Sequence, residues 1–257
     1  MIIETHCHLD YLKAEAFEEL LSKMKEAQIE KAITIGVDPE NLDKVMELSN
    51  HHENIFFTQG IHPHDAKSAT EVEFNKIIQR ATMKKMVAVG EIGLDYHYNN
   101  SPREVQIEVF ERQLQLACDL NLPVVIHTRE ADEDTRDILK NFSSKLKSKG
   151  VIHSFTSSKE LAEFVLSENF YIGFNGIITF KNAINVQDVV KITPIEQILF
   201  ETDSPFLTPV PHRGKENAPY YLPHIVNKIS ELKDVPLDIL KPQVYKNSFN
   251  CFPKLAL

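Results

Sequence analysis

Six side chains of metal-binding types are spread along this sequence of 257 residues. Four imidazoles and two carboxylates make up the set: His6, His8, Glu91, His127, His153 and Asp203. Imidazoles and carboxylates together suit Zn²⁺, Mn²⁺, Fe, Ni or Co. Six ligands are too many for one catalytic ion that must keep an open position, but they suit two ions about 3.5–4 Å apart. The set therefore predicts a hydrolytic site with two divalent metal ions.

A division of these ligands follows, with one carboxylate shared. We expect His6, His8 and Asp203 on one ion, His127 and His153 on the other, and Glu91 as the bridge. A water between two dications ionises near neutral pH and becomes a nucleophile. Asp203 can accept its proton and return it to the leaving group. Asp203 and Glu91 are thus the predicted catalytic residues.

Short apolar runs that predict buried parallel strands recur along the whole chain. We place eight strands, at Ile2–His6, Ala32–Val37, Ile55–Ile61, Val87–Ile92, Val124–His127, Val151–Phe155, Tyr171–Gly176 and Ile198–Thr202. Segments between them have helical periodicity, such as the one containing Phe17, Leu20, Leu21 and Met24. This alternation predicts a (β/α)8 TIM barrel, an α/β fold in a single domain over residues 1–257. A doubly wound open sheet shows the same local pattern.

The positions of the ligand-type residues favour the barrel over the open sheet. They fall at the carboxyl ends of the predicted strands, which converge on one face of a barrel but form a long row in an open sheet. A lone histidine at a strand end is more often structural, but agreement at several strand ends is hard to explain in that way. Because side chains alternate along a strand, His6 and His8 face the same way and Cys7 becomes a packing residue.

Composition limits the partners and the compartment. The 28 basic and 37 acidic residues give a formal charge of −9, which argues against broad adhesion to nucleic acid without excluding a nucleic-acid enzyme. The 3 cysteines form no C-x-x-C pair, and no apolar run approaches the ~18 residues of a membrane helix. We expect a cytoplasmic protein with no membrane association, and no feature calls for an obligate protein partner.

Seven motifs, in order along essentially the whole chain, resemble the TatD family of metal-dependent deoxyribonucleases, which belongs to the amidohydrolase-like TIM barrels. The motifs are Glu4-Thr5-His6-Cys7-His8-Leu9-Asp10, Gly60-Ile61-His62-Pro63-His64, Gly90-Glu91-Ile92-Gly93-Leu94-Asp95-Tyr96, Val125-Ile126-His127-Thr128-Arg129, His153-Ser154-Phe155, Gly176-Ile177-Ile178-Thr179-Phe180-Lys181-Asn182-Ala183 and Glu201-Thr202-Asp203-Ser204-Pro205. The resemblance implies metal binding at the six residues above. It also implies Mg²⁺-, Mn²⁺- or Zn²⁺-dependent hydrolysis of phosphodiester bonds, as a 3′→5′ exonuclease on single-stranded or damaged DNA.

The resemblance further implies four substrate-binding residues, His62, His64, Arg129 and Arg213. Arg129 lies two residues past His127, so it projects to the same face and could hold a phosphate bidentately. The alternative for Arg129 is a salt bridge to Glu130 or Asp132 on the barrel rim. Glu201 shares the face of Asp203, and we expect it to orient a metal ligand.

Two departures from the family pattern lie in loops. After His153 the family usually has Cys-Phe-Ser-Gly, where this chain has Ser154-Phe155-Thr156-Ser157. After Lys215 the family usually has Arg-Asn-Glu-Pro, where this chain has Glu216-Asn217-Ala218-Pro219. Both loops could meet substrate, whereas neither departure touches the ligand set, so they bear on the substrate rather than on metal hydrolysis.

Two other functions stay open. The same site could hydrolyse a small phosphoester, a lactone or an aminoacyl-tRNA ester, since the nucleophile would attack a carbonyl carbon as readily as phosphorus. The acidic charge and Glu216 favour this function, while Arg129, Arg213 and Lys215 favour a phosphate-bearing substrate. A non-catalytic metal-binding scaffold is disfavoured by the complete ligand set. Tyr96 and Tyr98 could stack on bases or pack on the rim.

Overall fold

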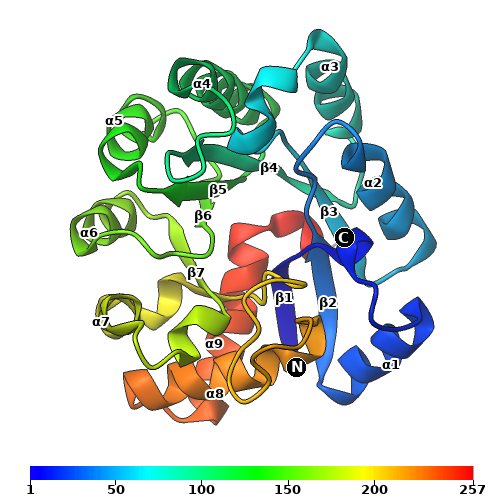
Figure 1. The fold of residues 1–257 in the computed structure, drawn as a ribbon, viewed down its shortest axis with the longest axis vertical. Helices are drawn as coiled ribbons and strands as arrows, with labels where there is room; N and C mark the ends of the chain where they lie inside the picture. The colour runs from blue at the N-terminus through cyan, green and yellow to red at the C-terminus, as the bar shows by residue number, and fades with distance from the viewer. Residues whose placement is uncertain (257) are drawn as a thin grey trace.

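Eight parallel strands follow one another around a barrel in this computed structural model, which describes residues 1–256 (Figure 1). They are β1 (Ile2–Cys7), β2 (Ile29–Thr34), β3 (Ile55–Gln59), β4 (Met86–Asp95), β5 (Val124–Arg129), β6 (Gly150–Ile152), β7 (Tyr171–Phe174) and β8 (Ile198–Phe200). Each strand pairs with the next in the sequence. The backbone amide of Asp203 donates to the His6 carbonyl over 2.9 Å, and that of His8 donates to the Ser204 carbonyl over 2.7 Å. These bonds join the segment after β8 to β1, so the predicted TIM barrel is confirmed.

Helices surround the strands (Figure 1). They are α1 (Phe17–Glu26), α2 (Asn41–His51), α3 (Glu71–Arg80), α4 (Arg103–Leu120), α5 (Asp132–Phe142), α6 (Lys159–Ser167), α7 (Ile184–Ile192), α8 (Leu222–Lys233) and α9 (Leu237–Cys251). The predicted periodicity holds in α1, where Leu20 and Met24 are buried while Glu18 and Glu19 face solvent. Within residues 1–256, no helix combines the length and apolar character needed to cross a membrane.

Strand bounds differ from the predicted ones where pairing overrides the apolar pattern. β2 begins at Ile29 and includes Lys31, which lies opposite Ile3 of β1. β4 continues to Asp95 because its last residues pair with β5. β6 ends at Ile152, earlier than predicted, so His153 lies in the loop just after it. β8 is also shorter than predicted, and Asp203 lies beyond it, as expected.

The C-terminal segment closes one end of the barrel. Buried apolar side chains from most of the strands form one cluster with it, which places the cluster inside the barrel: Ile3, Ile33, Phe56, Val87, Val125, Val151, Leu199, Phe252 and Leu255. The segment comprises α9 and a short 3₁₀ helix, Pro253–Ala256, and is coloured red in Figure 1. The carboxyl ends of the strands are left to form the other face, where the predicted ligands lie.

Candidate metal centre

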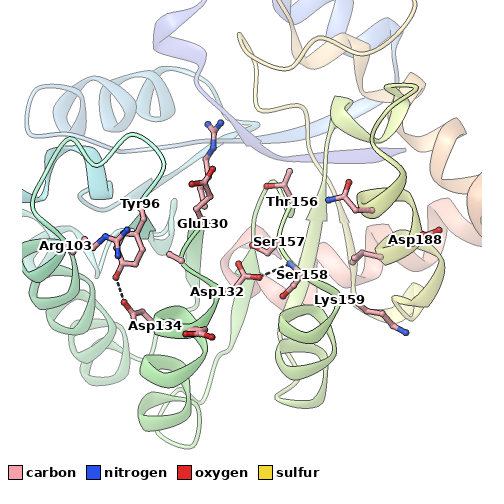
Figure 2. Close-up of a pocket in the computed structure, with 15 residues that line it drawn as sticks. Tyr96, Arg103, Glu130, Asp132, Asp134, Thr156, Ser157, Ser158, Lys159 and Asp188 are labelled. Carbon is pink, nitrogen blue, oxygen red and sulfur yellow. Dashed lines mark hydrogen bonds between the residues drawn. The ribbon is translucent and has the colours of Figure 1, made fainter.

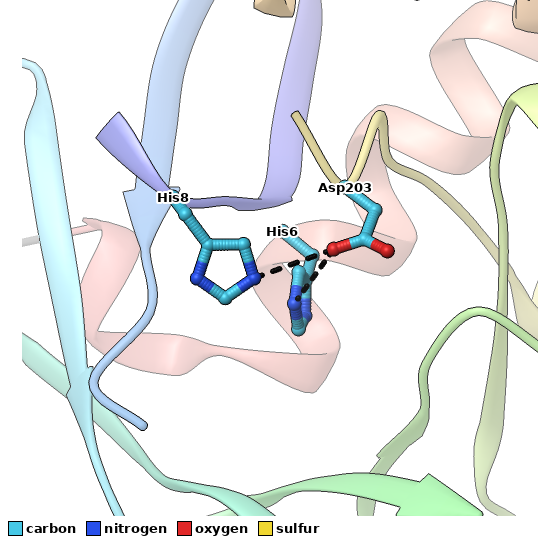
Figure 3. Close-up of side chains that lie close together, drawn as sticks. All are labelled: His6, His8 and Asp203. Carbon is cyan, nitrogen blue, oxygen red and sulfur yellow. Dashed lines mark ion pairs between the residues drawn. The ribbon is translucent and has the colours of Figure 1, made fainter. Parts of the chain in front are cut away.

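The first predicted group of ligands comes together where β1 meets the segment after β8 (Figure 3). Nε2 of His8 lies 3.3 Å from Oδ1 of Asp203, and Nε2 of His6 lies 3.6 Å from the same oxygen. The ligand atoms of His6, His8 and Asp203 all lie within 4.8 Å of one another, close enough to hold one ion. The backbone bond between Asp203 and His6 that closes the barrel also fixes this group.

Glu91 lies between this group and the other imidazoles. Its Oε2 is 3.4 Å from Nε2 of His6, while its Oε1 is 3.1 Å from Nδ1 of His127 and 2.7 Å from Nε2 of His153. Burial opposes ionisation of Glu91, but the neighbouring imidazoles of His153 and His62 hold its pKa well below the ordinary value. A carboxylate whose two oxygens face two groups of imidazoles has the arrangement expected of a bridging ligand.

The rings of His6 and His153 provide a test of whether the site suits metal ions. Both are buried, and they stack with their centroids 3.8 Å apart. Within residues 1–256, neither nitrogen of either ring makes a hydrogen bond of acceptable geometry, although Oε1 of Glu91 lies 2.7 Å from Nε2 of His153. Because buried polar atoms in proteins are nearly always hydrogen-bonded, these four nitrogens indicate a missing partner. The donor set therefore fits divalent metal ions.

Asp95 is a residue that the sequence analysis did not single out. Its Oδ2 lies 3.0 Å from Nε2 of His127 and 3.0 Å from Nε2 of His64. Burial opposes ionisation of Asp95, but these two hydrogen bonds keep its pKa far below the ordinary value, so it acts as an acceptor. An Nε2–H of His127 that donates to Asp95 leaves the Nδ1 lone pair directed toward Glu91, where an ion would be held.

His62 and His64 follow β3 on either side of Pro63. Nδ1 of His62 accepts the backbone N–H of His64 over 3.2 Å, so a neutral His62 ring carries its proton on Nε2. That Nε2 lies 3.4 Å from Oε1 of Glu91. His62, Glu91 and His127 are close enough to hold an ion by distance alone. The backbone hydrogen bond instead makes His62 a donor, which agrees with the predicted role in contacting substrate.

Two further carboxyl groups lie buried beside the ligands. Oε1 of Glu4 accepts the backbone amides of His6 and Thr202 over 2.9 and 3.0 Å, which ties β1 to the segment after β8. Oε1 of Glu201 accepts the amide of Ser154 over 2.5 Å and lies 3.8 Å from Nδ1 of His153. Glu201 thus holds the loop that follows His153 and makes no hydrogen bond to that ring. Burial raises the pKa of Glu4 to about 8 and that of Glu201 well above its ordinary value.

A cavity of about 710 Å³ opens over the ligands, and Arg129 lies in its wall beside His62 and His64. The Arg129 guanidinium carbon lies 4.7 Å above the Tyr98 ring centroid. The alternative salt bridges of Arg129 are not formed, since Glu130 pairs with His97 and Asp132 accepts the amide of Ser158. The guanidinium N–H groups are therefore available to a ligand in the cavity.

The basic part of the loop after β8 lies outside the cavity. The guanidinium carbon of Arg213 lies 3.9 Å above the Phe180 ring centroid, and neither Arg213 nor Lys215 lines the cavity. Glu216 accepts the backbone amides of Lys13 and Ala14 over 3.1 and 2.9 Å. Its negative charge is used to hold the loop after β1 and is not presented to the metal site.

A second cavity of about 980 Å³ adjoins the first, with Arg129 and Thr156 in the walls of both (Figure 2). Thr156 and Ser157, where the chain departs from the family pattern, lie in its wall. Its charged side chains are mainly acidic: Glu130, Asp132, Glu133, Asp134 and Asp188 against Arg103, Arg129 and Lys159. The second cavity therefore disfavours a polyanion and suits a less negative part of a substrate.

Known proteins are similar to this chain in sequence and in fold. The chain matches the family described as "TatD related DNase" over residues 3–253. It belongs to the TatD family. Among its TatD relatives, the "Uncharacterized metal-dependent hydrolase YabD" of Bacillus subtilis is 38% identical over 253 residues, which cover 98% of this chain and 99% of the relative. The "3'-5' ssDNA/RNA exonuclease TatD" of Escherichia fergusonii is 30% identical over 220 residues, covering 83% and 84% of the two chains.

A solved structure agrees with the sequence relatives. The crystal structure of YjjV, a TatD homologue from Escherichia coli K12, superimposes with a TM-score of 0.92 at 29% identity, covering 98% of both chains. This TatD-family protein is a metal-dependent hydrolase on a TIM barrel.

Proposed function

We propose that this TatD-family hydrolase is a two-metal 3′→5′ exodeoxyribonuclease that cleaves phosphodiester bonds of single-stranded or damaged DNA. The observation that carries the proposal is the position of Glu91, whose Oε2 faces His6 while its Oε1 faces His127 and His153. The relative named as an exonuclease on single-stranded DNA and RNA supports the substrate class. Unpaired cysteines, at positions 7, 118 and 251, fit a reducing compartment, and we place the activity in the cytoplasm.

We propose the division of the ligands that was predicted from the sequence. His6, His8 and Asp203 would hold one ion, His127 and His153 the other, with Glu91 shared. Bound ions, of Mg²⁺, Mn²⁺, Zn²⁺, Ni²⁺ or Fe²⁺, would supply an activated water and neutralise charge on the phosphoryl group.

The protein's own side chains supply the remaining steps. His8 and the neighbouring imidazoles keep the pKa of Asp203 below its ordinary value despite burial, so its carboxylate is ionised. We propose that it accepts the proton of the attacking water. Asp203 can then return that proton to the leaving oxygen. Arg129 offers free N–H donors to a phosphate, and His62 can donate its Nε2–H from the same wall of the cavity. The Nε2–H of His64 is already donated to Asp95.

The test is to remove all metal and to reload the protein separately with Mg²⁺, Mn²⁺ and Zn²⁺. Each form is incubated with 5′-end-labelled single-stranded DNA. We expect a ladder that shortens from the 3′ end and requires added metal. The control is Asp203→Asn, since asparagine tolerates the backbone angle φ of 58° at this position. We expect it to lower the rate about 10²–10⁴-fold. A ladder that persists in this variant, or no ladder with any metal, contradicts the proposal.

The second cavity favours one other substrate class. Its acidic wall suits a substrate that carries a cationic group, such as the amino group of an aminoacyl ester on tRNA. Hydrolysis of such an ester by the metal-loaded protein, with no cleavage of DNA, would move the assignment to this class. Cleavage of DNA alone would exclude it.

A further inference from the structure

The wall of the metal-site cavity carries aromatic rings that face solvent. Nine large hydrophobic side chains are exposed among residues 1–256, and the two aromatic ones are Tyr98 and Phe206, which are 56% and 52% exposed. Both line the metal-site cavity. The other seven exposed hydrophobic side chains do not line it. Exposed aromatic rings thus gather at this cavity within the described chain, which marks them as candidates for contact with a ligand.

The two rings stand on opposite walls. Tyr98 follows β4 and Phe206 follows β8, four strands apart in a barrel of eight. The Tyr98 ring lies edge-on to His64, with centroids 5.3 Å apart, and the Phe206 ring lies edge-on to His8, with centroids 5.9 Å apart. Each ring is therefore held against a histidine of the site, and the ligands lie between them.

Tyr96, the other tyrosine that the sequence offered for stacking, is used differently. Its hydroxyl donates to Asp134 over 2.6 Å, the Arg103 guanidinium carbon lies 4.1 Å above its ring centroid, and the residue does not line the metal-site cavity. Tyr98 instead lies under Arg129, whose N–H groups are unpaired in the described structure. A phosphate bound at Arg129 would bring the attached nucleoside next to the Tyr98 ring.

We propose that Tyr98 and Phe206 are base-stacking residues that select unpaired nucleotides at the end of a strand, with Arg129 holding the adjoining phosphate. The proposal rests on the nuclease function proposed above and adds the feature of the substrate that the cavity recognises. Aromatic rings stack on any base, so recognition is tolerant of sequence. A base inside a duplex is already stacked and paired, so an unpaired nucleotide is the one that can stack on either ring.

The test compares two single-stranded oligonucleotides that differ only at the 3′ end. One ends in normal nucleotides, and in the other the last two carry tetrahydrofuran in place of the sugar and base. The variants are Tyr98→Ala and Phe206→Ala. The matched control is Val210→Ala, a side chain 47% exposed in the same loop as Phe206 but outside the cavity.

We expect each aromatic variant to raise KM for the normal oligonucleotide about tenfold, the effect of losing one stacked base, and to leave KM for the abasic one unchanged. Phe206→Tyr should retain the normal KM, whereas Phe206→Leu should not. An equal rise in KM for both oligonucleotides, or no rise for either, overturns the stacking role. If the wild-type protein cleaves neither oligonucleotide with any metal, the nuclease function itself has failed, and that result is seen before any variant is compared.

Discussion

At the scale of single residues, the site depends on hydrogen bonds that direct the imidazoles. Asp95 accepts from His127 and His64, and the bond to His127 leaves its other nitrogen facing Glu91. Outer carboxylates of this kind set the tautomer and raise the basicity of a metal-binding imidazole. We therefore propose Asp95 as a positioning residue for an ion that His127 would hold.

Asp95→Asn should weaken metal binding or lower activity about 10- to 100-fold, because the amide is a poorer and only partial acceptor. Titration of the metal-free protein with Zn²⁺ measures the affinity directly. Asp134→Asn is the matched control, since Asp134 accepts from Tyr96 on the same rim and does not line the metal-site cavity. An unchanged affinity in Asp95→Asn would show that Asp95 does not orient His127.

The sequence predicted some residues of the site and missed others for identifiable reasons. The structure brings the six predicted ligand residues together, because residue type and position at a strand end are both visible in the sequence. Asp95 was also within reach, since Glu91 and Asp95 lie four positions apart and share one face of a strand. Glu216 was misjudged because its partners are the amides of Lys13 and Ala14, about two hundred positions away in the sequence.

At the scale of elements, β4 and β5 must approach closely to set Glu91 beside His127. Gly93 lies between Glu91 and Asp95 with a φ of 137°, and a Cβ atom there would overlap the carbonyl oxygen of His127. Gly93 thus satisfies two requirements that other residues cannot meet, a positive φ and a close backbone contact.

Gly93→Ala should lower the free energy of unfolding by about 3 kcal/mol or more and reduce the bound metal, since both strain and overlap arise beside a ligand. Gly214→Ala is the matched control, because Gly214 has a φ of 85° but no atom within 4 Å of an added Cβ. Gly214→Ala should lower the free energy of unfolding by only about 1 kcal/mol. Urea unfolding and metal analysis of both variants give the comparison. Equal decreases in the free energy of unfolding in the two variants would show that the contact with His127 does not matter.

Strand existence was predictable, whereas strand ends were not. Apolar runs located all eight strands because buried parallel strands are apolar on both faces. The charged start of β2 and the long end of β4 depend on hydrogen bonds to the neighbouring strand, and these leave no trace in an apolar pattern.

At the scale of the whole molecule, the packed core and the predicted metal site occupy opposite ends of the barrel. The C-terminal segment fills one end with Phe252 and Leu255, and the predicted ligands gather at the other. The bonds that close the barrel, between the segment after β8 and β1, involve His6 and Asp203 themselves. The convergence of ligands that favoured a barrel in the sequence is thus part of the barrel's closure.

Phe252→Ala should lower the free energy of unfolding by about 3–5 kcal/mol while the folded protein keeps its metal content and kcat. Phe252 is fully buried, whereas Ile239 on α9 is 54% exposed, so Ile239→Ala serves as the control with little expected change. Urea unfolding at low temperature measures the free energy of unfolding, and metal analysis measures the metal content. Loss of metal without loss of stability would contradict the separation of the two ends.

The central claim is that Glu91 bridges two ions, and the most direct test is to load the metal-free protein with Mn²⁺. We would measure the number of ions per chain and the electron paramagnetic resonance spectrum. Two ions about 3.5–4 Å apart should give two Mn²⁺ per chain and a spin-coupled spectrum. Glu91→Gln should remove the coupling. A single uncoupled ion in the wild-type protein, or a coupled spectrum that survives in Glu91→Gln, would contradict the bridging role.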